Sequence, residues 1–344
     1  MTYNIWNKWD KLKTVMLGTC HPLEFYDKSL DPKVRDPLLR ITEETLEDLE
    51  YYESVLKDFG CQVLRPPTDH DTLEHYLTKR SMNIPRSALQ PRDTQLVIGN
   101  KLVVSGHDNQ GIIQTLKQYN SQDIKLYPGI FEGLKSNPQP NQSWNGGFMA
   151  PCVTVVNNKI FYDTKEINEQ NVTWLKQNFP TFEYVPVSIG GHNDACFHTI
   201  KPGAIISLHE IQTYEHTFPD WDVCYLPDQS WDKVEDFIKV KHKTFGKWWI
   251  PGEESNDALA NWINTWLNDW VGYVEETVFD VNVLVLDERH VCISNPNNAV
   301  INNFLKTHAM EPIHIPWRHR YFWDGGLHCI TLDLEREGSM ASDI

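Results

Sequence analysis

The feature that most constrains the fold is a pattern of short β-hairpins that recurs along the chain. In each copy two apolar strands are joined by a tight turn, and a helical stretch and one further strand follow. The turn residues tolerate a positive φ or a sharp bend, and the flanking residues alternate or are β-branched. The pattern predicts hairpins at residues 94–106, 152–163, 196–208 and 281–294, and thus an α/β protein of repeated ββαβ units.

A fifth unit is complete only if the two ends of the chain meet. Residues 13–19 have the pattern of a strand, and a helix over residues 42–60 and a strand from Cys61 follow. Acidic residues at the predicted helix start and Gly60 at its end favour these bounds. The missing partner strand is HCITLDL at residues 328–334. We therefore predict that the C-terminal strand pairs beside the first, which closes a ring of five units without an open edge.

One segment interrupts the repeat. Residues 228–276 form an insertion in which Trp262, Trp266 and Trp270 recur at every fourth position, so a helix there would carry three rings on one face. We expect that face to pack on the body of the protein; a rim over the site and a subunit contact are the alternatives. The prediction is one domain over residues 1–344 with a Trp-rich helical insertion.

Composition excludes several classes of function. The formal charge of −16 argues against nucleic acid or an anionic membrane as a partner and favours cationic ligands. The seven cysteines are odd in number and form no CxxC pair, so neither a disulfide framework nor a zinc site is predicted. The N-terminus lacks the apolar run of a signal peptide, and no stretch approaches the roughly 20 apolar residues that span a bilayer. A cytoplasmic location with free thiols is expected.

The loops just before the hairpins carry the polar residues that stand out. Asp93 directly precedes a predicted strand, His192 and Asp194 follow two glycines in GGHNDACF, and Cys329 follows two glycines in DGGLHC. In a ring of equivalent units these positions match, so the side chains are expected to face one axis. Taken singly, each residue more often has a structural role: a small buried thiol, a structural histidine, or an aspartate in a cap or turn. Their shared placement favours a functional site.

These motifs, together with NKWDKLKTVMLGT, PRDTQLVIGN and VNVLVLDERHV, resemble the glycine (arginine:amine) amidinotransferase family, from about Trp6 to Gly338. The family is part of the guanidino-group-modifying superfamily, which includes arginine deiminases. The resemblance implies the α/β propeller, or pentein, fold of five ββαβ units, in agreement with the hairpin count. It implies an amidinotransferase with a small-molecule guanidine donor and amine acceptor as partners. No metal or other cofactor is implied, and a homodimer is common in the family.

Carried over to this chain, the resemblance assigns the nucleophile to Cys329 and the acid/base to His192. The two carboxylates that hold the guanidinium fall on Asp93 and Asp194. A guanidinium is planar and always charged, and its N–H groups match carboxylates bidentately. A thiolate attacks its central carbon, His192 protonates the leaving amine, and an amine or water then resolves the amidino-cysteine. Transfer and hydrolysis therefore share their first half-reaction.

The chain departs from the family in two places. The carboxylate that orients the histidine in the family falls on Met149, and residues 144–158 contain neither Asp nor Glu. Asn145 would serve as a neutral substitute only if the loop is rebuilt. This loss keeps open an amidinotransferase, an arginine or guanidine hydrolase, and a catalytically impaired guanidine-binding relative. Asp280 stands where relatives carry a small polar residue that contacts the substrate, and Asn282 nearby is a second predicted contact. An added anion at Asp280 favours a cationic acceptor; a solvated Asp before a strand is the alternative.

Overall fold

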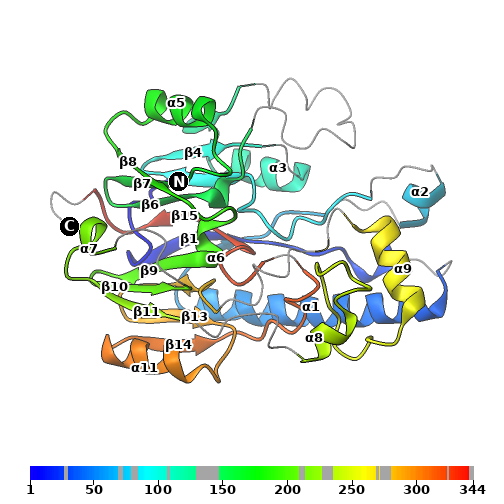
Figure 1. The fold of residues 1–344 in the computed structure, drawn as a ribbon. Helices are drawn as coiled ribbons and strands as arrows, with labels where there is room; N and C mark the ends of the chain where they lie inside the picture. The colour runs from blue at the N-terminus through cyan, green and yellow to red at the C-terminus, as the bar shows by residue number, and fades with distance from the viewer. Residues whose placement is uncertain are drawn as a thin grey trace.

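The computed structural model describes residues 1–26, 30–68, 73–78, 84–106, 109–128, 147–208, 214–226, 235–268, 271, 280–323 and 325–340. Fifteen strands in these ranges form five three-stranded sheets (Figure 1). In the second to fifth sheets an antiparallel hairpin continues into a strand that pairs parallel to its second member, as the repeat predicts.

The sheets follow one another along the chain. The second comprises β3 (Gln95–Ile98), β4 (Lys101–Val104) and β5 (Ile124–Leu126), and the third comprises β6 (Val153–Val156), β7 (Lys159–Asp163) and β8 (Glu183–Val187). The fourth comprises β9 (Phe197–Lys201), β10 (Ala204–Ser207) and β11 (Asp222–Tyr225), and the fifth comprises β12 (Leu284–Val285), β13 (His290–Ile293) and β14 (Glu311–His314). The four predicted hairpins are thereby confirmed.

The first sheet joins the two ends of the chain. β1 (Leu12–Leu17) pairs parallel to β2 (Gln62–Leu64) on one side and antiparallel to β15 (Thr331–Arg336) on the other, with Leu17 opposite Thr331. Figure 1 shows β15 and β1 side by side. The predicted pairing of the C-terminal strand beside the first strand is confirmed, and it brings the turn that carries Cys329 to the start of the chain. Closure of the five sheets into one ring stays a prediction.

In each unit a helix lies between the two strands that pair in parallel; these helices are α1 (Pro32–Asp58), α3 (Gln110–Tyr119), α5 (Glu169–Asn178), α7 (Tyr214–Thr217) and α11 (Ala299–Thr307). α2 (Leu73–Thr78) and α6 (Asn193–Cys196) lie between units, α8 (Glu235–Val240) and α9 (Asp257–Trp266) lie in the insertion, and the 3₁₀ turns are η1 (Leu23–Phe25) and η2 (Ala150–Cys152). The predicted start of α1 at Thr42 is wrong: Asp31 caps the helix by accepting from the backbone of Lys33, and Pro32 occupies the first position. Its end at Gly60, with φ of 98°, agrees with the prediction.

The insertion packs against α1, as its apolar face predicts. α9 contacts α1, and Trp262 and Trp266 lie half-buried against a core cluster that contains Leu38 and Ile41 of α1; Figure 1 shows α9 near one end of α1. Trp270 lies outside the described residues. Elsewhere in the insertion the ring of Trp249 lies 5.1 Å from that of Tyr321, so the segment leading to Cys329 is also supported. No helix in the described ranges is long and apolar enough to cross a membrane.

Candidate functional site

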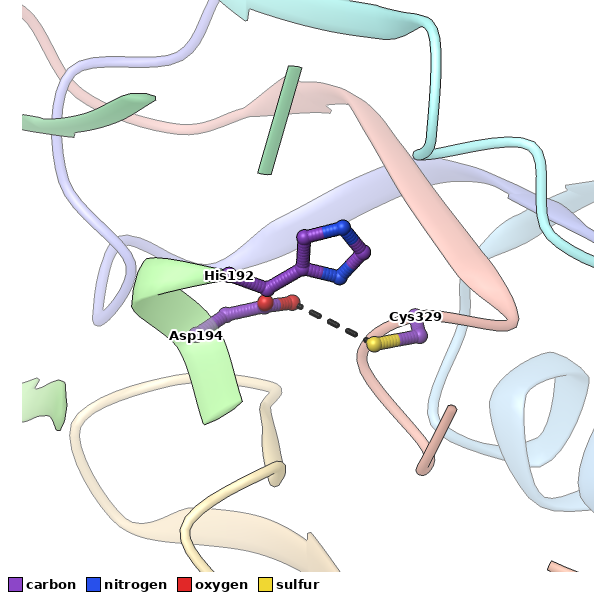
Figure 2. A group of neighbouring side chains, drawn as sticks. All are labelled: His192, Asp194 and Cys329. Carbon is purple, nitrogen blue, oxygen red and sulfur yellow. Dashed lines mark hydrogen bonds between the residues drawn. The ribbon is translucent and has the colours of Figure 1, made fainter. Parts of the chain in front are cut away.

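Three of the predicted site residues come together from distant parts of the chain. The ligand atoms of His192, Asp194 and Cys329 all lie within 4.8 Å of one another, and all three residues are buried (Figure 2). His192 stands at the start of α6 and Asp194 lies within it, while Cys329 lies in the turn before β15. The cluster thus brings an imidazole, a carboxylate and a thiol to one point. By distance alone the three could also hold a metal ion.

Two glycines clear the space around the thiol. Gly325 has a φ of 106°, and a Cβ on it would lie 2.4 Å from the Cβ of Cys329. A Cβ on Gly326 would lie 2.7 Å from the Oδ1 of Asn282. Both contacts are far shorter than van der Waals separations, so side chains at these positions would displace the thiol or its neighbour. The glycines of DGGLHC are therefore needed by the turn.

Asn282 holds this turn and contacts the sulfur. Its Oδ1 accepts hydrogen bonds from the backbone N–H groups of His328 at 2.8 Å and Cys329 at 3.2 Å. Its Nδ2 lies 3.0 Å from the Sγ of Cys329 and donates to it. A donor at this distance favours the thiolate over the thiol. Asn282 thus contacts the nucleophile candidate, and its predicted contact with the substrate stays a prediction.

His328 is a site residue that the sequence reasoning missed. Its Nδ1 lies 2.6 Å from the Oδ2 of Asp194, which is also 3.6 Å from the Sγ of Cys329. Burial, with the nearby charges of Arg92 and Lys8, lowers the pKa of His328 to about 3, against the opposing effect of Asp194. Burial acts to raise the pKa of Asp194, but the hydrogen bond from His328 and nearby positive charges hold it well below its usual value. At neutral pH the pair is a carboxylate and a neutral imidazole that donates through Nδ1–H.

A layer of buried charges supports the nucleophile turn from behind. The Nε of Arg92 donates to the carbonyls of His328 and Thr331, both at 2.9 Å, and its guanidinium pairs with Asp333 at 2.7 Å. Lys8 lies 3.9 Å from Asp333, and burial lowers the pKa of this lysine to about 7. A small internal cavity lies between this layer and the site, lined by Lys8, Arg92, Asp194, His198, His328 and Asp333 among others.

Asp93 and Asp280 lie outside the group of three. Asp93 precedes β3, its carboxylate is 3.6 Å from the guanidinium of Arg86, and its side chain is 13% exposed. Asp280 is buried: its Oδ2 accepts from the amides of Asn295 and Asn298, both at 2.8 Å, and its Oδ1 lies 3.5 Å from Arg320. The alternative of a solvated Asp280 is wrong. Arg320 matches the charge of Asp280 within the chain. A role of Asp280 in attracting a cationic acceptor stays a prediction.

The structure gives His192 no acid from the position where the family carries one. Met149 is half-buried and packs against the apolar cluster of the second and third units. Asn145 lies outside the described residues. The assignment of the family's acid to the position of Met149 stays a prediction, and this apolar side chain leaves the placement of His192 to other contacts.

Comparison with curated proteins finds amidinotransferases among the relatives of this chain. No family model matches the chain. Mitochondrial glycine amidinotransferase of Danio rerio is 21% identical over 335 residues, covering 87% of this chain and 71% of the relative. The L-arginine:L-lysine amidinotransferase of Pseudomonas savastanoi pv. phaseolicola is 22% identical over 326 residues, covering 86% of this chain and 80% of the relative.

Solved structures extend the likeness to the fold. SxtG, an amidinotransferase from Microseira wollei in the saxitoxin biosynthetic pathway, matches with a TM-score of 0.65 at 19% identity over 99% of each chain. A dimethylarginine dimethylaminohydrolase matches with a TM-score of 0.56 at 9% identity over 93% of this chain and 99% of that chain. Such likeness shows a shared fold and leaves the reaction to the site. The resemblance of this chain to the glycine amidinotransferase family, within the pentein fold, is thereby confirmed.

Proposed function

We propose that this protein is an amidinotransferase that moves an amidino group from arginine, or a similar guanidine donor, to an amine through an amidino-Cys329 intermediate. The observation that carries the proposal is the meeting of His192, Asp194 and Cys329 within 4.8 Å. Similarity to amidinotransferases along most of the chain supports the same reaction. We further propose one domain over residues 1–344, with its five units closed in a ring around the site and a homodimer as the assembly.

The donor guanidinium would be held by carboxylates. In our proposal Asp194 and Asp93 accept its N–H groups and turn its central carbon toward the sulfur. A bound cation matches the charge of Asp194, which lies 3.6 Å from the sulfur and otherwise disfavours a thiolate. The Nδ2 of Asn282 stays as a donor to the sulfur. Substrate binding and thiolate formation would therefore favour each other.

The first half-reaction is a substitution at carbon. Cys329 gives its proton to His192, and the resulting thiolate forms a C–S bond to the guanidinium carbon. His192 returns this proton to the leaving amine as the C–N bond breaks, which yields a cationic amidino-thioether and a free amine. In the second half-reaction an acceptor amine attacks the same carbon, gives a proton to His192, and releases the cysteine.

Hydrolysis is the second candidate, because water in place of the amine resolves the same intermediate. This candidate is supported by the fold that the chain shares with a dimethylarginine dimethylaminohydrolase. A guanidine-binding relative without catalysis is the third, since Met149 stands where the family carries an acid. The three differ in their products, so product analysis distinguishes them.

The test is incubation of the protein with arginine and a panel of amines, followed by mass spectrometry of the small molecules. We expect repeated release of ornithine and formation of a new guanidino product only with a suitable amine, because without one the release stops at one ornithine per Cys329; Cys329→Ala should give neither. Urea with ornithine, or citrulline with ammonia, formed repeatedly without an amine would establish hydrolysis instead. Binding of arginine with neither product nor a Cys329 adduct would support the impaired relative and overturn the proposal.

A further inference from the structure

The loop that leads into His192 is anchored by a single buried carboxylate. Asp163 ends β7 and is fully buried. Its Oδ1 accepts from the backbone N–H groups of Lys165 at 3.2 Å and Ile189 at 2.9 Å. Its Oδ2 accepts from Gly190 at 2.6 Å and Gly191 at 3.1 Å. A buried carboxylate needs such donors to offset its lost hydration, and here backbone amides supply all four.

The backbone of this loop is shaped to bind an anion. Three consecutive N–H groups, from Ile189 to Gly191, converge on the two oxygens of Asp163. Convergence of this kind requires one residue with a positive φ, and Gly190 has a φ of 82°. The loop and the carboxylate therefore specify each other, and this contact explains Gly190, the first glycine of GGHNDACF.

Two further hydrogen bonds, each with a residue of the third unit, hold the chain on both sides of His192. On the N-terminal side, the thiol of Cys152 donates to the carbonyl of Gly191 at 3.2 Å. On the C-terminal side, the Nδ2 of Asn193 donates to the carbonyl of Phe161 in β7 at 3.4 Å. The backbone that carries the imidazole is thus fixed mainly by the end of β7.

We propose that Asp163 is a positioning residue for His192: it fixes the backbone from which the imidazole projects toward Cys329, in a chain whose family acid is replaced by Met149. Asp163 does not touch the reacting atoms. Asp163 acts on His192 indirectly, by holding the loop, whereas the acid that the resemblance implies for the family orients the histidine itself. This inference rests on the proposed function, because it assigns His192 the task of protonating the leaving amine.

The leaving group decides how much a reaction depends on His192. An arginine-like donor expels an amine, which leaves only when it receives a proton. S-methylisothiourea carries the same amidino group on a methylthio group. When Cys329 attacks, the bond between the amidino carbon and the methylthio sulfur breaks and methanethiolate leaves. Methanethiolate is a weaker base than the amide anion of an unprotonated amine leaving group, so it leaves without a proton from His192 and takes its proton from water. Misplacement of His192 should therefore slow transfer from arginine far more than transfer from S-methylisothiourea.

The experiment compares the two donors by the rate at which each forms the amidino adduct on Cys329, followed by intact-protein mass in single turnovers. Asp163→Ala removes both acceptor oxygens, and Asp163→Asn keeps one. We expect the ratio of the arginine rate to the S-methylisothiourea rate to fall by about 100-fold in Asp163→Ala, within the range of general acid catalysis, and by less in Asp163→Asn. Thr164→Val is the matched control: it removes the neighbouring bond to the carbonyl of Val187 and should leave the ratio unchanged.

A second variant covers the case in which Asp163→Ala does not fold. Gly190→Ala keeps the carboxylate but strains the loop at its positive φ, and it should lower the same ratio. Equal slowing with both donors, or an unchanged ratio in Asp163→Asn and Gly190→Ala, would overturn the positioning role while leaving the proposed function standing. A wild-type protein that forms no adduct with either donor would overturn the proposed function and this inference with it.

Discussion

The turn that carries Cys329 and the loop that carries His192 are fixed in different ways. The Cys329 turn is held by side chains from other units: Asn282 binds two of its N–H groups, and Arg92 binds the carbonyls at its end. The His192 loop is held through its own main chain, which wraps around the carboxylate of Asp163. The position of the Cys329 thiol therefore depends on several separate residues, whereas the position of the His192 imidazole depends largely on one.

Asn282 offers the largest effect on the Cys329 side. Asn282→Leu keeps the approximate size but removes the donor to sulfur and the acceptor for two N–H groups. We expect turnover, and the rate of Cys329 alkylation at neutral pH, to fall by about 100-fold, the order seen when one oriented donor to a developing charge is lost. The pH profile of alkylation by iodoacetamide should move to higher pH, because the thiolate loses a hydrogen bond.

The control for this variant is Asn303→Ala on the exposed side of α11, which should alter neither rate. An alkylation profile of Asn282→Leu that coincides with that of the wild type would show that the amide does not stabilise the thiolate.

Arg92 tests whether the support behind the turn is also structural. Arg92→Met leaves Asp333 without its 2.7 Å partner and two carbonyls without their donor, all in buried surroundings. We expect the free energy of unfolding, measured by urea denaturation, to fall by about 3–5 kcal/mol. Arg289→Met removes the exposed pair with Glu311 and should cost less than about 1 kcal/mol. Similar losses in the two variants would contradict the assigned role of Arg92.

His328 tests the carboxylate of Asp194, which lies beside both His192 and Cys329. In His328→Asn the amide stands near the position of Nδ1 and can still donate to Asp194, whereas in His328→Gln it is displaced. We expect the KM for the guanidine donor to rise by about tenfold in His328→Gln, the cost of one hydrogen bond to a charged group, and by less in His328→Asn. A larger rise of KM in His328→Asn than in His328→Gln would rule out the Nδ1–H group as the donor to Asp194.

Lys8 is tested by the pH dependence of stability. Its pKa in the folded protein is lowered to about 7 from its usual value of 10.5, so between these values the unfolded chain binds up to one more proton than the folded chain. Stability should therefore rise with pH across this window, by up to about 1.4 kcal/mol per pH unit for this group. The difference in unfolding free energy between wild type and Lys8→Met, measured from pH 7 to pH 9, should carry this slope. A flat difference would show that Lys8 titrates normally.

The parts of the fold that could be predicted are those written in local pattern. Alternation and turn residues fixed the hairpins, and a missing partner strand for β1 pointed to the C-terminal strand. The start of α1 was missed because acidic residues after Thr42 imitate a first turn, although Asp31 and Pro32 together carry a stronger start signal.

The site was predictable only where residue type and position coincide. His192, Asp194 and Cys329 stand at equivalent places before strands, so the repeat predicted that they would lie together, whereas Asp93 stands at such a place and lies outside the group. The bond from His328 to Asp194 depends on the direction of a side chain in a turn, which no repeat specifies. The role of Asp163 depends on loop amides that converge on it, and its only sequence signal is the pair of glycines before His192.

The most direct test of the central claim is the mass of the protein after brief incubation with arginine in the absence of an amine. The account predicts a gain of about 42 Da, one amidino group, confined to the peptide that contains Cys329, with one ornithine released per adduct. An adduct on another residue, or ornithine released without any adduct, would contradict covalent transfer through Cys329.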